Sequence, residues 1–97
     1  MTVTLHPGAQ RDLDEAAAFY AREGSPAVAA RFLKEFERVA MFVHAHPGAG
    51  TLRTRGRRSF PTMGFPYTII YRQVPSGICV LVVKHDRLRP GHGGGRR

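Results

Sequence analysis

Two helical patterns separated by a short joint constrain the fold of this 97-residue chain more than any other feature. Apolar residues recur at helical spacing over residues 9–20, and again over residues 28–43. Gly24 ends the first pattern, Ser25 is a favourable helix cap, and Pro26 suits a first helical turn. So short a joint predicts an antiparallel helical hairpin. Its apolar stripes must be covered by another part of the chain.

Strand patterns occupy the remaining segments. Residues 2–5 alternate polar and apolar side chains, and three further strands are expected at Leu52–Phe60, Phe65–Arg72 and Ile78–His85. The last is almost wholly apolar, which indicates an interior strand. Turn-forming residues between the last three strands predict antiparallel connections.

These patterns predict one α+β domain over residues 1–92, with the order β-α-α-β-β-β. The helical hairpin should pack on one face of a mostly antiparallel four-stranded sheet, leaving the arginines to the opposite face or the rim. Residues 93–97, Gly-Gly-Gly-Arg-Arg, are expected to form a flexible tail.

Positive charge is concentrated in the second half of the chain. The formal net charge is +8; residues 1–50 carry five basic and six acidic side chains, whereas residues 51–97 carry ten basic and one acidic. This asymmetry predicts an anionic partner for the second half, either a nucleic acid or an acidic protein segment. The simpler alternative is a solvated basic face.

Three arginines alternate within the expected strand at Leu52–Phe60. A strand would project Arg53, Arg55 and Arg57 from one face, as a stripe able to follow a phosphate backbone, and Arg58 from the other. An edge strand protected from aggregation by its charge would show the same pattern.

Several classes of protein are disfavoured. No apolar run approaches the roughly 18 residues that span a bilayer, and the chain begins with a strand-like segment instead of a signal peptide, so we expect a cytoplasmic protein without membrane contact. Cys79 lies in an apolar segment and is interpreted as a core thiol. His44 and His46 lack the further ligands of a metal site. We therefore expect no metal or other cofactor.

Three segments together have a distinctive order and spacing. They are Pro47-Gly48, then Arg57-Arg58 leading to Gly64-Phe65-Pro66-Tyr67-Thr68-Ile69-Ile70-Tyr71, and finally His85-Asp86-Arg87-Leu88-Arg89-Pro90-Gly91. On these segments, behind an N-terminal helical hairpin, the chain resembles the RelE/ParE superfamily of toxins from type II toxin–antitoxin systems, and within it the plasmid-stabilisation ParE-like proteins. The resemblance implies a RelE/ParE-like fold.

The resemblance also implies a growth-inhibiting toxin that a cognate antitoxin neutralises, in a dimer or a heterotetramer with that antitoxin. ParE-like members inhibit DNA gyrase, whereas RelE-like members cleave mRNA on the ribosome. Many relatives continue the last motif with Tyr-Trp, but this chain has His92-Gly93. That departure and the Phe65-Pro66-Tyr67 strand start favour gyrase inhibition. A non-toxic module that binds nucleic acid or a partner is a further alternative.

A metal-independent endoribonuclease would need a proton acceptor for the 2′-hydroxyl, cations beside the phosphorane and a donor for the leaving oxygen. His85 and His92 are the candidates for proton transfer, and Arg58 and Arg87 for charge stabilisation. A strand-end histidine and a mobile tail residue are the alternative interpretations of the two histidines. The candidates for binding the target or a nucleic acid share a positive charge: Arg53, Arg55, Arg57, Lys84 and Arg89.

Overall fold

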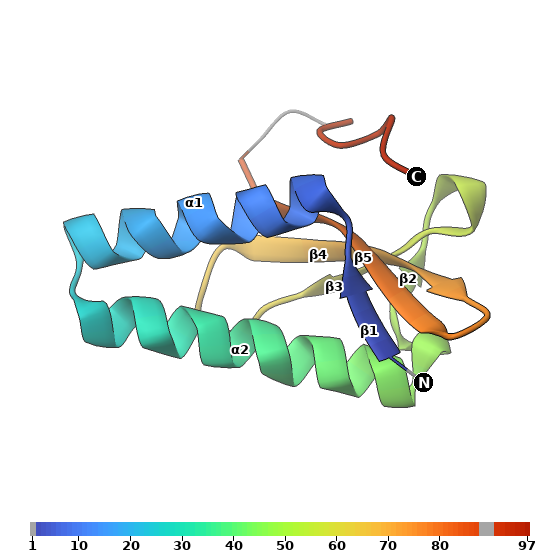
Figure 1. Ribbon diagram of the computed structural model, residues 1–97, viewed down its shortest axis with the longest axis horizontal. Coiled ribbons are helices and arrows are strands. Elements are labelled where there is room, and N and C mark those ends of the chain that lie inside the picture. The colour runs from blue at the N-terminus through green and yellow to red at the C-terminus, as the bar shows by residue number, and fades with distance from the viewer. Residues whose placement is uncertain (1, 88–90) are drawn as a thin grey trace.

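The computed structural model describes residues 2–87 and 91–97 (Figure 1). Its elements are β1 Thr2–Leu5, α1 Pro7–Glu23, α2 Pro26–Ala45, η1 Pro47–Ala49, β2 Thr51–Leu52, η2 Thr54–Gly56, β3 Arg58–Pro61, β4 Tyr67–Val74 and β5 Gly77–His85. The predicted α+β fold is confirmed, with five strands in the sheet where we expected four. No helix in the described ranges is long and apolar enough to cross a membrane.

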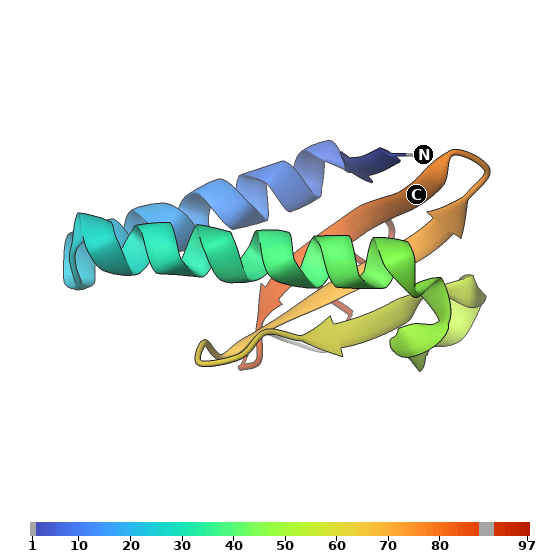
Figure 2. The ribbon, with the colours of Figure 1, turned by 90° about the horizontal axis from the view of Figure 1, so that it is seen from below.

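The two helices form the predicted hairpin on one face of the sheet (Figures 1 and 2). Ser25 caps α2, because its Oγ accepts a hydrogen bond from the Val28 N–H at 3.2 Å, and Pro26 occupies the first turn. At the start of α1, the His6 Nδ1 accepts from the Gly8 N–H at 2.9 Å. These side chains satisfy amide groups that the first turn of a helix leaves without partners.

The sheet has the strand order β1-β5-β4-β3-β2. β1 pairs with β5 in parallel, and the other neighbours are antiparallel. β5 therefore has a neighbour on each side, which confirms it as an interior strand. Because β1 pairs only with Gly77–Val80, the edge of β5 beyond Val80 is free to contact α1.

The basic segment 52–60 is not the single strand that we predicted. It contains the end of β2, the turn η2 and most of β3. Arg55 and Gly56 have φ angles of 60° and 71°, in the left-handed region where a strand cannot continue. Arg53, Arg55 and Arg57 therefore do not project from one face of a strand, and the prediction that they would was wrong.

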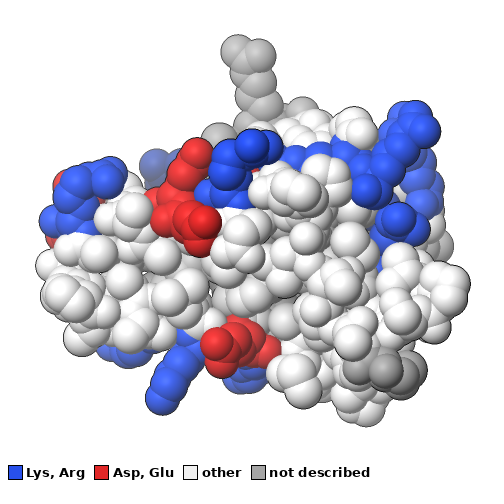
Figure 3. Space-filling view, in the orientation of Figure 1, with Lys and Arg blue, Asp and Glu red and all other residues white. Residues whose placement is uncertain are grey.

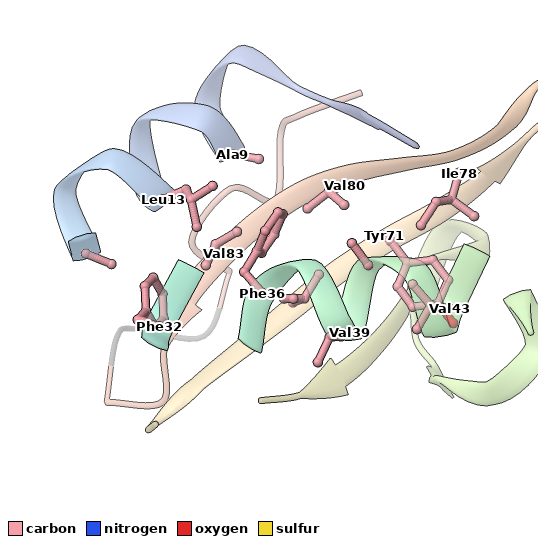
Figure 4. Close-up of a cluster of buried hydrophobic side chains, with 13 residues drawn as sticks. Ala9, Leu13, Phe32, Phe36, Val39, Val43, Tyr71, Ile78, Val80 and Val83 are labelled. Atoms are coloured by element: carbon pink, nitrogen blue, oxygen red, sulfur yellow. The ribbon is translucent and has the colours of Figure 1, made fainter. Parts of the chain in front are cut away.

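The core lies between the helical hairpin and the sheet (Figure 4). Its shielded side chains come from α1, α2, β4 and β5: Ala9, Leu13, Ala16, Phe32, Phe36, Val39, Ala40, Val43, Ile69, Tyr71, Ile78, Val80 and Val83. The Phe32 ring is wholly buried, and its centroid lies 5.3 Å from that of Tyr20 and 5.1 Å from that of Tyr67. Tyr71 belongs to this buried layer, and the partly buried Tyr67 packs against it.

Tyr71 also connects the segment after α2 to the sheet. Its hydroxyl donates to the Pro47 carbonyl oxygen at 2.7 Å and accepts from the Gly50 N–H at 3.0 Å. A Cβ at Gly50 would lie 2.7 Å from this hydroxyl oxygen. The close approach therefore requires glycine at position 50.

Cys79 is not the core thiol that we predicted. It is partly exposed and pairs in register with Arg72. Its neighbours Ile78 and Val80 are buried in the core, and successive side chains of a strand point to opposite faces. Cys79 therefore lies on the face away from the helices.

Candidate functional site

The face of the sheet away from the helices, which we call the open face, is polar and basic. On β4, Ile69 and Tyr71 point into the core, so Thr68, Ile70 and Arg72 point to the open face. Residues 91–97 fold back over it (Figures 1 and 2). An open groove of about 410 Å³ is lined by Arg53, Thr54, Arg57, Ser59, Thr68, Ile70, Lys84, Asp86, Gly91, His92 and Gly94.

Arg57 is the most buried basic side chain of this face, with only 9% of its surface exposed. Its guanidinium donates to the carbonyl oxygens of Gly93, at 3.4 Å, and Arg96. Burial lowers the pKa of Arg57, and the positive charges of Arg55 and Arg72 lower it further. The guanidinium therefore lies in crowded positive surroundings.

Arg53 and Arg55 reach the same region from the turn η2 and its N-terminal flank. The Arg53 Nε donates to the Ser59 Oγ at 2.9 Å, and its backbone N–H donates to the Arg57 carbonyl oxygen at 2.7 Å. The Arg55 guanidinium donates to the Gly94 carbonyl oxygen at 3.2 Å. A closed loop, instead of a strand, brings Arg53, Arg55 and Arg57 together. Lys84 of β5 lines the same groove, while Arg89 lies outside the described residues.

Arg58 points away from Arg57, as expected. It pairs in register with Tyr71, a core residue, and its Nη1 donates to the Gly50 carbonyl oxygen at 3.0 Å. Arg58 therefore supports the segment after α2 and lies apart from the groove on the open face.

The two histidines of the predicted nuclease site share a cavity beside α1. A volume of about 440 Å³ is lined by Asp12, Glu15, Ala16, Phe19, Tyr67, Val83, His85 and His92. The His85 ring stands edge-on to Tyr67 with centroids 5.2 Å apart, and its Nδ1 accepts from the Arg87 N–H at 3.1 Å. The His92 Nε2 lies 3.3 Å from Asp12 Oδ1. The Arg87 side chain is exposed.

Comparison with known proteins assigns the family. The family model described as "ParE toxin of type II toxin-antitoxin system, parDE" matches residues 3–89. This chain belongs to the ParE toxin family. A solved structure described as "Chromosomal ParDE TA system from P. aeruginosa" shares the fold, with a TM-score of 0.75 and 20% identity over 88% of this chain and 95% of that chain. No match was found among curated protein sequences.

In this ParE-family chain the nuclease candidates occupy two separate places. His85 and His92 lie beside α1, with Arg87 following β5. Arg58 pairs with Tyr71, which pairs with Val80. Val80 precedes His85 by five positions, a separation of about 16 Å along the strand. The four residues therefore do not converge on one phosphate. Among the described residues, no group of three or more His, Cys, Asp or Glu side chains offers a metal site.

Asp12 is the contact residue that sequence reasoning missed. Its Oδ2 accepts from the Val83 N–H at 3.1 Å and from the Arg96 Nη1 at 2.6 Å. Burial raises the pKa of Asp12, but hydrogen bonds from Arg96, Val83 and His92 outweigh it, so the pKa lies below its ordinary value. Asp12 thereby joins the ParE-family helix α1 to the free edge of β5 and to the tail.

Proposed function

We propose that this type II toxin inhibits DNA gyrase in the cytoplasm without catalysing a reaction, and that a cognate antitoxin neutralises it. One observation supports the non-catalytic mechanism: Arg58 lies across the sheet from His85 and His92. Metal-independent RNA cleavage depends on proton transfer and charge stabilisation acting together at one phosphate. The match of residues 3–89 to the ParE family supports the gyrase branch of the resemblance.

The open face is the surface proposed to contact the target. Arg53, Arg55, Arg57 and Lys84 line its two basic hollows. Arg89, outside the described residues, remains a predicted contact. Exposed cations steer association with an acidic surface and set the partner's orientation. Removing such charges should therefore weaken inhibition without unfolding the protein.

The antitoxin is proposed to supply an acidic segment that folds over the helical hairpin and the open face. This follows from the ten basic and one acidic side chains of residues 51–97. The expected result is co-purification of the two proteins as a heterotetramer or as a simple dimer, which light scattering after size-exclusion chromatography distinguishes. Failure of the two to co-purify would contradict this part of the proposal.

The direct test uses purified protein and purified gyrase. We expect inhibition of supercoiling, or trapped cleavage complexes, that His85→Ala and His92→Ala leave within about twofold of the parent. The double variant R53Q/R55Q should weaken inhibition by about tenfold, as expected for loss of about 1.4 kcal/mol. The double variant R11Q/R31Q, which removes two exposed charges from the helices, is the matched control for loss of positive charge. No effect of the parent protein on gyrase would overturn the proposal.

A ribosome-dependent endoribonuclease is the second candidate, because His85 and His92 line one cavity together with Asp12 and Glu15. The nuclease predicts codon-positioned cuts in mRNA on purified ribosomes, and their loss in His85→Ala and His92→Ala.

A non-toxic binding module, the remaining alternative, predicts normal growth after induction.

A further inference from the structure

We propose that Arg55, Arg57, Arg72 and Arg97 form a site for phosphate groups on the open face. This goes beyond the proposed function, because the site would be present whatever the target of the toxin. Arg72 and Arg97 belong to neither of the predicted sites.

Four arginines from separate segments converge on one hollow. Arg55 belongs to η2, Arg57 precedes β3, Arg72 belongs to β4 and Arg97 to the tail. Together they line an open pocket of about 570 Å³, a size typical of small-molecule sites. In Figure 3, Lys and Arg atoms gather at the upper right, at the end of the molecule where η2 lies in Figure 1.

Among the described residues, no acidic side chain balances the positive charge of this pocket. No acidic side chain lines it, and within the described ranges none of its four arginines forms a salt bridge. Asp86, the single acid of the second half, instead accepts a hydrogen bond from the Thr68 hydroxyl at 2.7 Å. Like charges repel each other, and Arg57, the buried one of the four, lies beside Arg55 and Arg72. An anion in the pocket would remove this repulsion.

Some N–H donors of the pocket arginines have no hydrogen-bond partner, and others have only a neutral one. The Arg72 Nε is buried and has no hydrogen-bond partner in the structure, whereas buried polar groups almost always have one. Among the described residues, the Arg57 and Arg55 guanidinium groups donate only to neutral carbonyl oxygens of the tail. A charged oxygen forms a stronger hydrogen bond with a guanidinium than a neutral one does.

Phosphate fits these requirements better than a single carboxylate. The planar guanidinium fork matches phosphate oxygens in bidentate geometry. Several cations around one hollow favour a ligand with several negative charges, such as a polyphosphate or consecutive phosphodiesters. Both sources present the same chemistry to the arginines.

The test measures binding of inorganic pyrophosphate, by calorimetry, and of a fluorescent single-stranded oligodeoxynucleotide, by anisotropy, to the purified chain at low salt. Arg72→Gln and Arg55→Gln should each weaken binding by about tenfold, or about 1.4 kcal/mol. The charge-matched control Arg11→Gln should change it by less than about twofold. Arg72→Lys, which keeps the charge and loses the fork, should be intermediate. Thermal unfolding of each variant establishes that it is folded.

Binding of either probe would support the proposed site, and the two probes distinguish its possible ligands. Binding of pyrophosphate alone identifies a free phosphate compound, whereas binding of the oligodeoxynucleotide identifies a nucleic-acid backbone. Oligonucleotide affinity should also fall with increasing salt, as phosphate contacts release counterions. Binding of neither probe would overturn the proposal, as would equal losses in Arg72→Gln and Arg11→Gln.

Discussion

The two faces of the sheet differ in the interactions that hold their side chains in place. The face under the helices is a continuous apolar layer, in which Ile69 is wholly buried and Tyr71 is 1% exposed. The open face, built from the same strands, carries arginines that are held by individual hydrogen bonds to β3 and to the tail. The hydrophobic effect is nondirectional, whereas each polar contact depends on one donor and one acceptor. We therefore expect stability to reside mainly on the first face and binding on the second.

The largest expected effect is the loss of a core ring. Phe32→Ala should lower the free energy of unfolding by about 3–5 kcal/mol, because it leaves a cavity where three aromatic rings meet Phe32. Phe19→Ala is the matched control, since that ring is 46% exposed, and should cost less than about 1 kcal/mol. Urea unfolding followed by circular dichroism measures both. Equal losses would contradict the assignment of stability to the buried apolar layer.

Removing one buried hydroxyl should have the next largest effect. Tyr71→Phe keeps the ring in the core but leaves the Gly50 N–H without its acceptor, which should cost about 1–3 kcal/mol. The same unfolding experiment tests this. A change below about 0.5 kcal/mol would show that water replaces the hydroxyl at this position.

The contact of Asp12 with the tail should have a smaller, pH-dependent effect. The lowered pKa of Asp12 means that its contribution is fully present above the unfolded value, about 3.9, and is lost as the pH falls through the folded value. Asp12→Asn should therefore cost about 1 kcal/mol near neutral pH, and the difference from the parent should shrink below about pH 4. Hydrogen exchange of residues 93–97 reports whether the tail then becomes flexible, as we predicted from its sequence. A difference independent of pH would exclude the ionised carboxylate as the cause.

The smallest expected effect on stability is that of Arg72→Gln. Arg72 contributes to the crowding of positive charge on the open face, so its loss should change the free energy of unfolding by less than about 0.5 kcal/mol. Chemical denaturation beside the parent protein provides the measurement. A large loss would assign Arg72 to the structural part of the sheet and remove the contrast between the faces.

Periodicity and capping residues were sufficient to predict much of the helix-covered face. Ser25 and Pro26 placed the start of α2, and the apolar run from Ile78 identified an interior strand. These signals are local, because each depends on neighbours along the chain. The family resemblance then agreed with the match over residues 3–89.

The open face was harder to predict because its contacts join distant positions. Asp12 and Arg96 are 84 positions apart, and nothing near Asp12 in the sequence marks it as an anchor. The break at Arg55 had a signal, since a glycine within a strand pattern often marks a bulge or turn. Because three arginines alternate regularly here, the segment was interpreted as a strand although Gly56 indicated a turn.

The most direct test of gyrase inhibition follows thymidine and methionine incorporation, and mRNA integrity, in one culture after the protein is induced without its antitoxin. Inhibition of gyrase predicts an early fall in thymidine incorporation while mRNA remains intact. An early collapse of methionine incorporation with codon-positioned cuts in mRNA would contradict it and would support the ribosomal nuclease.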